Sequence, residues 1–183
     1  MFARGFKAYC EAMVQALRRE VGAVEDKPLD MGRACDFLHI PVYSLADLLI
    51  AGGVSRDAPH VNEIYDSVSA FTTFEADYRT IVYNDDHTLP RHRSNLAHEI
   101  AHALLLHPPE GPGVADADHE RHEAEATWLG GVLMLTAAQA RRLVLQGMSS
   151  ERAQLEYQIS AQMLRYRINV TGASKLGRSF ASA

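Results

Sequence analysis

The residues best suited to chemistry lie in the segment SNLAHEIAHALLLH, residues 94–107, where two histidines stand four positions apart and a glutamate directly follows the first. Side chains four residues apart share one face of an α-helix, so the imidazoles of His98 and His102 can hold one metal ion. Glu99 lies on the same side, about 60° around the helix from His102. Its carboxylate can take a proton from a water molecule instead of binding the ion. The spacing therefore predicts a zinc site with a general base beside it.

The surroundings of the motif support this interpretation. Histidine and glutamate are frequent enough in this chain that the bare pattern arises by chance in a few per cent of shuffled sequences, so the motif alone is only suggestive. Here it follows a predicted strand, and Ile100, Ala103 and Leu104 fall on the opposite, core-facing side of the helix. This amphipathic context favours a functional site over coincidence.

A catalytic zinc ion needs a third protein ligand and an open fourth position. The segment DADHERHEAEATWLGGVLMLT, residues 116–136, predicts a second helix that can run antiparallel past the first and supply it; its candidates are His119, Glu120, His122, Glu123 and Glu125. Glu125 is favoured because small alanines flank it and an apolar face follows it, formed by Trp128, Leu129, Val132 and Leu133. The predicted site is then His98, His102 and Glu125, a gluzincin-like His₂Glu set, with His122 or Glu123 as alternatives to Glu125.

The elements that must position these residues are mostly helical. The pattern predicts an α+β fold in which a small β-sheet precedes a zincin-type H-E-x-x-H helix and a C-terminal helical subdomain follows. The runs VSAFTTF and YRTIVYN predict a hairpin over 68–84. IPVYS, residues 40–44, predicts a short extended piece, and the residues TGASKLG are expected to fray. Helices are predicted near 6–21, 29–40, 45–52, 90–106, 118–135, 137–146, 149–157 and 160–169, with a shorter one within 56–67.

Local signals fix several of these boundaries. Ser44 with Asp47, and Thr136 with Gln139, have the spacing of capping boxes, and Pro90 suits the first turn of a helix. HPPEGPG, residues 107–113, ends the motif helix. We expect a metal-binding domain over 1–147 and a helical extension packed on it over 148–183.

Composition excludes several classes of protein. A net charge of −5 argues against a nucleic-acid binder coated in positive charge. The longest apolar run, WLGGVLML, is too short to cross a bilayer, and the N-terminus lacks the apolar core of a secretory signal. Cys10 and Cys35 are expected as reduced core thiols. The sequence therefore predicts a cytoplasmic protein without membrane contact, and it assigns no oligomeric state.

The C-terminal segment SSERAQLEYQISAQMLRYRIN loosely resembles a helix-turn-helix reader of DNA. Its basic content is low, and the spacing from Ala153 to Ser160 is one residue longer than usual for that motif. Packing of Leu155, Ile159, Met163, Leu164 and Ile168 onto the rest of the protein is the favoured reading, and direct DNA binding is not expected.

The two central segments together resemble a known family. NLAHEIAHALLLH followed by EAEATWLGGVLML is similar to the ImmA/IrrE zinc metallopeptidases, and the opening segment and the strand before the motif resemble the family too. The resemblance implies that His98, His102 and Glu125 bind zinc and that Glu99 is the general base. Thr127, Leu129-Gly130 and Thr136 depart from the family pattern, which leaves the register of the third ligand open.

What the resemblance implies about function is hydrolysis of a peptide bond in one protein partner. In the family, that partner is usually a helix-turn-helix transcriptional repressor of a phage, a mobile element or a stress response. The alternative is a regulatory or toxin-type metal-binding protein that binds its partner or DNA without cleavage. The strand Tyr78–Asn84 is a candidate for an exposed edge that could pair with a substrate peptide; the alternative is a purely structural strand of the hairpin. His119, His122, Tyr65, Tyr78 and Tyr83 are the candidates for stabilising an oxyanion.

Overall fold

The computed structural model describes residues 2–75, 78–108 and 118–176. Within these ranges the chain is mostly helical with one small sheet, which confirms the expected fold class. The helices are α1 Phe6–Glu20, α2 Met31–Phe37, α3 Leu45–Ala51, α4 Val61–Ser67, α5 Leu89–Leu104, α6 His119–Met134, α7 Ala137–Leu145, α8 Ser150–Tyr157 and α9 Ala161–Val170. Ala173–Leu176 form a short 3₁₀ helix in the segment expected to fray.

The predicted caps form as the sequence indicates. The side chains of Ser44 and Asp47, and of Thr136 and Gln139, bond reciprocally to the backbone at the starts of α3 and α7. Pro90 lies in the first turn of α5, where a missing N–H costs little. Of the segment 107–113, only residues 107 and 108 are described.

The sheet contains β1 Val42–Ser44, β2 Ala70–Glu75 and β3 Tyr78–Tyr83, in the order β1-β3-β2. The hairpin pairs β2 antiparallel to β3, with Thr72 opposite Ile81. β1 adds to the other side of β3 in parallel, with Tyr43 opposite Val82. The strand Tyr78–Asn84 is therefore central, and its interpretation as an exposed edge is wrong. β2 is an edge instead.

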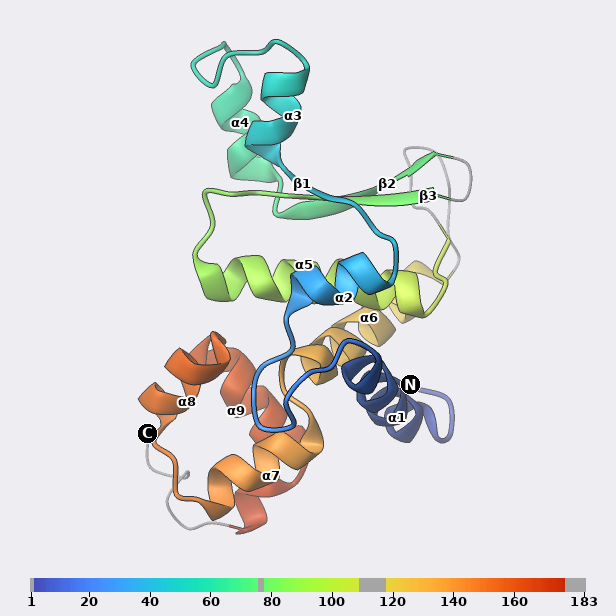
Figure 1. The fold of residues 1–183 in the computed structure, drawn as a ribbon, viewed down its shortest axis with the longest axis vertical. Helices are drawn as coiled ribbons and strands as arrows, with labels where there is room; N and C mark the ends of the chain where they lie inside the picture. Colours follow the sequence, from blue (N-terminus) through green and yellow to red (C-terminus); the bar gives the residue numbers. More distant parts are fainter. Residues whose placement is uncertain (1, 76–77, 109–117, 177–183) are drawn as a thin grey trace.

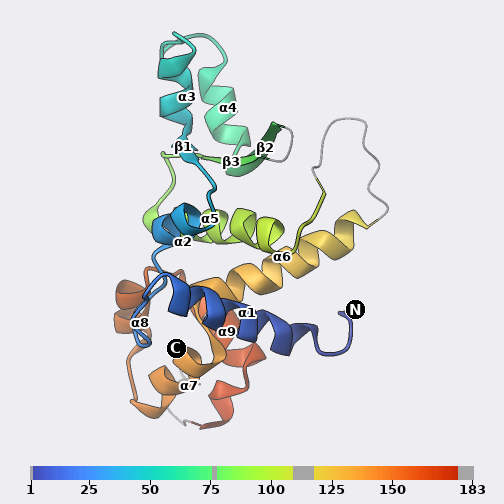
Figure 2. The ribbon, with the colours of Figure 1, turned by 45° about the vertical axis from the view of Figure 1, so that its right-hand side comes forward.

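The elements stack in layers (Figure 1). α3 and α4 lie beyond one side of the sheet, and α5 runs along its other side. α6 crosses beneath α5, and α1 and α7–α9 gather around the lower part of α6, as the turned view confirms (Figure 2). α5 is thus held between the sheet and α6, so that residues from both neighbours can approach its motif.

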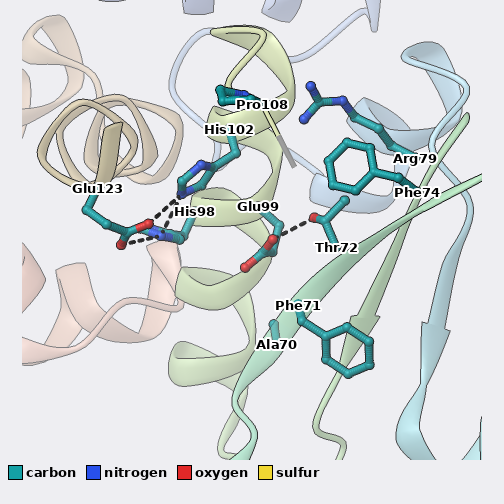
Figure 3. A pocket seen from close by; sticks show the side chains of 10 residues that line it. All are labelled: Ala70, Phe71, Thr72, Phe74, Arg79, His98, Glu99, His102, Pro108 and Glu123. Atoms are coloured by element: carbon teal, nitrogen blue, oxygen red, sulfur yellow. Dashed lines mark hydrogen bonds and ion pairs between the residues drawn. The ribbon is translucent and has the colours of Figure 1, made fainter. Parts of the chain in front are cut away.

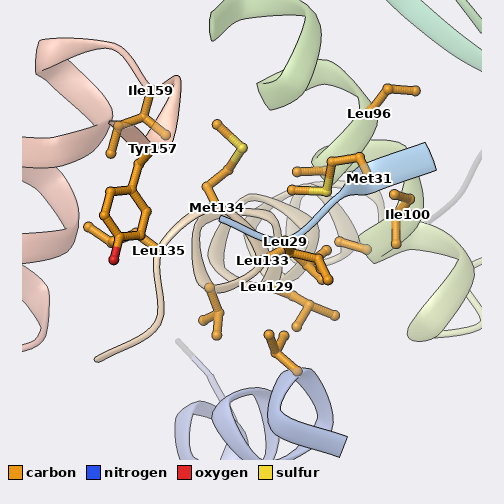
Figure 4. Close-up of a cluster of buried hydrophobic side chains, with 14 of the residues drawn as sticks. Leu29, Met31, Leu96, Ile100, Leu129, Leu133, Met134, Leu135, Tyr157 and Ile159 are labelled. Atoms are coloured by element: carbon orange, nitrogen blue, oxygen red, sulfur yellow. The ribbon is translucent and has the colours of Figure 1, made fainter. Parts of the chain in front are cut away.

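The main hydrophobic core surrounds α6. Its side chains come from several elements and include Leu29, Met31, Leu96, Ile100, Leu129, Leu133, Met134, Leu135, Tyr157 and Ile159 (Figure 4). Cys10 and Cys35 are buried in this core as free thiols, as expected. None of the helices in the described ranges combines the length and the apolar character that a membrane crossing needs.

The C-terminal helices pack on this core. Arg167 of α9 is fully buried, and its guanidinium donates to Oε1 of Glu11 and to the carbonyl of Leu135, each at 2.7 Å. Ile159, Leu164 and Ile168 are buried, whereas Leu155 is exposed. The division of the chain at residue 147 stays a prediction.

Candidate metal centre

The histidines of the motif face each other on α5. Nε2 of His98 and Nε2 of His102 lie 3.0 Å apart, one turn of helix separating their backbones. The opposite face of this helix is anchored in the core, since Ala97, Ile100 and Ala101 are buried. The sequence pattern thus places both imidazoles on the side of α5 that faces away from the core.

Glu123 of α6 completes a group with these two histidines (Figure 3). Its Oε2 lies 3.3 Å from Nε2 of His98, and its Oε1 lies 3.1 Å from Nε2 of His102. One ligand atom from each residue falls within 4.8 Å of the others, the arrangement expected of a metal-binding triad. Among the described residues, this is the set of His, Cys, Asp and Glu side chains that could hold an ion.

Glu125, the third ligand that the sequence favours, lies outside this group. Its Oε2 is 3.4 Å from Nε2 of His107, and its Oε1 is 3.9 Å from a guanidinium nitrogen of Arg121. Residues two apart on an α-helix point about 200° apart around its axis, so one helix cannot direct Glu123 and Glu125 to the same point. In the structure Glu123, one of the two alternative third ligands, lies beside the histidines instead of Glu125. His122, the other alternative, stacks on His107 with ring centroids 4.3 Å apart.

Glu99 lines the same cleft as the triad. Its Oε2 accepts a hydrogen bond of 2.6 Å from the hydroxyl of Thr72 on the edge strand β2. Figure 3 shows the carboxylate turned toward that strand, away from the imidazoles. Thr72 therefore fixes the orientation of the residue predicted to act as a base, a role that the sequence pattern does not reveal.

The cleft extends on both sides of the triad. A cavity of about 230 Å³ is lined by His98, Glu99 and Glu123 together with Phe71, Phe74, Arg79 and Pro108. A second cavity of about 400 Å³ shares those three residues and continues past Ser69, Asn95 and His119. The motif thus lies in the middle of an open groove that follows β2, with space on both sides of the triad.

The electrostatics keep the second histidine neutral. Burial lowers the pKa of His102 to about 3, and the nearby His98 and His107 rings act in the same direction. Burial also lowers the pKa of His107, against the opposing effect of the hydrogen bond to Glu125. A neutral imidazole offers a lone pair, which is the form that binds a metal ion.

The candidates for oxyanion stabilisation are spread over the fold. The hydroxyl of Tyr65 donates to Asp85, the ring of Tyr83 packs against the tilted ring of His92, and Tyr78 is largely exposed at the start of β3. His119 is the candidate that borders the groove beside Glu99 and Glu123.

His107 is a further residue beside the triad that the sequence pattern does not single out. In the sequence, the prolines and glycines that follow His107 indicate only that the helix ends there, and nothing marks His107 as a residue near the site. In the structure His107 is buried, and its Nδ1 lies 3.1 Å from Nδ1 of His102.

Comparison with known proteins identifies a family for this chain. No curated protein matches the chain. The model of the family described as the IrrE N-terminal-like domain, peptidase family M78, matches residues 61–169. The match covers more than half of the chain and includes β2, β3, the motif helix, α6 and the C-terminal helices. The chain therefore belongs to the IrrE N-terminal-like family of peptidases, M78, which supports a metallopeptidase type of activity.

Proposed function

We propose that this protein is a zinc-dependent endopeptidase that hydrolyses a peptide bond in a specific protein partner. His98, His102 and Glu123 are the proposed zinc ligands, and Glu99 is the proposed general base. The observation that carries the proposal is the convergence of three ligand side chains from two helices at one point of a groove that Glu99 also lines.

The donor set fits zinc. Two imidazoles and one carboxylate are a combination that catalytic zinc sites use. In a tetrahedral site with bonds of about 2.0–2.1 Å, neighbouring ligand atoms lie about 3.3 Å apart. Here Nε2 of His102 lies 3.0 Å from Nε2 of His98 and 3.1 Å from Oε1 of Glu123, and the other carboxylate oxygen, Oε2, lies 3.3 Å from Nε2 of His98. The side chains therefore stand near the spacing that zinc requires.

The metal ion, Glu99 and Thr72 would have separate roles in the reaction. Zinc supplies a Lewis acid that polarises a water molecule and the carbonyl of the bond to be cut. Glu99 accepts the proton of the attacking water and passes it to the leaving amine. Thr72 holds the Glu99 carboxylate in place through its hydroxyl.

The groove supports an extended substrate. β2 is an edge of the sheet and runs beside the motif helix, so a peptide can pair with its backbone and cross the triad. Arg79 and the rings of Phe71 and Phe74 border the groove and would contact the side chains of that peptide.

For the partner, we propose a helix-turn-helix transcriptional repressor of a phage, a mobile element or a stress response, in the cytoplasm. The support is the resemblance to the ImmA/IrrE metallopeptidases in the motif helix and in α6. A repressor encoded beside this chain is the first substrate to test.

The test compares the parent protein with Glu99→Gln. Both should bind zinc, measured by elemental analysis, and only the parent should cut the repressor at a defined bond, found by mass spectrometry. Equal cleavage by both would refute the role of Glu99. Zinc binding without cleavage by either would favour the alternative, a regulatory protein that acts by binding alone.

A second pair of variants tests which glutamate is the third zinc ligand. Glu123→Ala should lose zinc more severely than Glu125→Ala, because it removes a ligand itself. The reverse order would return the assignment to Glu125.

A further inference from the structure

A line of side chains leads from the proposed metal site into the core. Nδ1 of His102 lies 3.1 Å from Nδ1 of His107, and Nε2 of His107 lies 3.4 Å from Oε2 of Glu125. The side chains of His107 and Glu125 are only 5% and 13% exposed, so little water competes for these contacts. We call these three residues the His102–His107–Glu125 chain.

The end of α5 places His107 in this line. Leu106 adopts a left-handed conformation with φ 56°, and the backbone folds back so that the N–H of His107 donates to the carbonyl of His102 at 3.0 Å. The N–H of Leu106 donates to the carbonyl of Ala103, which completes a Schellman motif. The ring of His107 therefore returns beside the last histidine of the motif instead of continuing into solvent.

Two further contacts hold His107 from other elements. The guanidinium of Arg79, on β3, donates to the His107 carbonyl at 2.8 Å. The ring of His122, on α6, stacks on the His107 ring at an angle of 26°. Sheet, motif helix and α6 together fix the position of this imidazole.

The directions of the hydrogen bonds follow from chemistry. A carboxylate only accepts, so Nε2 of His107 must carry the proton that is donated to Glu125. A neutral imidazole then has a lone pair at Nδ1, which accepts from Nδ1–H of His102. His102 is left with its lone pair at Nε2, the atom that faces His98 and Glu123.

We propose that His107 and Glu125 are positioning residues of the metal centre, which fix the tautomer and the ring orientation of His102. The inference rests on the proposed zinc site and extends it to residues that do not touch the ion. It also gives Glu125 a role. Glu125 would act through His107 on the zinc ligand His102, and would not bind the ion itself. Outer partners of this kind change metal affinity by about 10- to 100-fold in zinc proteins.

Zinc titration against a competing chelating dye tests the inference. His107→Leu removes the acceptor and should weaken zinc binding by about 10- to 100-fold. His107→Asn keeps an acceptor near the position of Nδ1 but loses the contact with Glu125, so it should recover only part of the affinity. His60→Leu makes the histidine-to-leucine exchange at a residue whose side chain is exposed at the start of α4, and as a control it should bind zinc like the parent. Glu125→Ala should weaken binding, and it should add little in the background of His107→Leu because both changes break the same chain.

Ring nitrogen spectra provide a readout that packing alone does not determine. Long-range ¹H–¹⁵N correlation in the parent protein should show His107 as the Nε2–H tautomer and His102 as the Nδ1–H tautomer. Unchanged zinc affinity in His107→Leu, or an Nδ1–H tautomer of His107, would overturn the inference while the zinc site stands. A parent protein that binds no zinc would refute the proposed function, and the inference with it.

Discussion

Replacement of Gly130 by alanine should destabilise the protein, although alanine is the better helix former. Gly130 lies where α6 crosses α5. A Cβ atom there would meet the backbone of α5, at 3.3 Å from the carbonyl oxygen of Ala97 and 3.4 Å from Cα of His98. These are backbone atoms of a packed helix and cannot move aside by changing a rotamer, so the two helices must separate by a few tenths of an ångström.

The magnitude follows from two opposing effects. Glycine to alanine within a helix gains about 1 kcal/mol in an unobstructed position. Inserting a methyl group into a well-packed contact costs about 1–3 kcal/mol. We expect the free energy of unfolding to fall by about 1 kcal/mol. Zinc binding should weaken too, because the forced separation lies at His98 itself, and ligand distances tolerate only about 0.2 Å.

Urea unfolding and zinc titration measure both effects, and Gly131→Ala is the matched control. Its added Cβ would meet side chains of α9 instead, at 3.2 Å from Cδ of Arg167 and 3.4 Å from Cε1 of Tyr166. This control should lose stability but keep its affinity for zinc. If Gly130→Ala is more stable than the parent by about 1 kcal/mol, as helix propensity alone predicts, the reasoning about the helix crossing fails.

Three further predictions concern the site and its surroundings. Leu106→Gly should raise the free energy of unfolding, measured in urea, by about 0.5–1 kcal/mol. Leu106 is exposed and has a φ of 56°, a conformation that is strained for leucine but not for glycine. A loss of stability would contradict this. Thr72→Val should preserve the fold and lower kcat/KM by about tenfold, since it removes a hydrogen bond to the Glu99 carboxylate; undiminished turnover would show that Thr72 does not orient the base. In the metal-free protein, burial holds the pKa of His102 at about 3, against roughly 6.5 when unfolded. As the pH falls below about 6.5 the unfolded state takes up a proton that the folded state does not, so this residue should reduce stability by about 1.4 kcal/mol per unit between about pH 6 and pH 4. His102→Gln should lack that part of the slope, and equal slopes in both proteins would disprove the assignment.

Features that depend on neighbours in the sequence were predictable. The capping boxes at Ser44 and Thr136 satisfy backbone groups within one turn, so their residues alone determine where α3 and α7 begin. The hairpin of β2 and β3 is similarly local, and the face shared by His98 and His102 follows from helix geometry.

The third ligand was not predictable from the apolar pattern. That pattern fixes how a helix is turned only when one side is apolar and the other polar. α6 is buried around its whole circumference over residues 128–134, because α5, α1 and α9 pack on different sides. Its rotation, and so the choice between Glu123 and Glu125, is decided by tertiary contacts.

The sheet edge and His107 were missed for related reasons. The three residues of β1 pair with a strand nearly forty positions away, and no local signal shows that this pairing makes β3 central. The left-handed turn at the end of α5 is formed by Leu106, where glycine would have marked it in the sequence.

The ion pair between the buried Arg167 and the partly exposed Glu11 has a consequence for cooperative unfolding. It joins the last long helix to Glu11 of α1 and to the carbonyl of Leu135 at the end of α6, the helix that carries Glu123 near its start. Unfolding of α9 alone would leave the partly buried Glu11 carboxylate and the Leu135 carbonyl without this donor, at a cost of about 1–3 kcal/mol. The backbone amides of α6 and α9 should therefore exchange with deuterium together, in a single global opening. The lifetime of the metal site would then be set by the C-terminal helices, which are remote from the bond being cut.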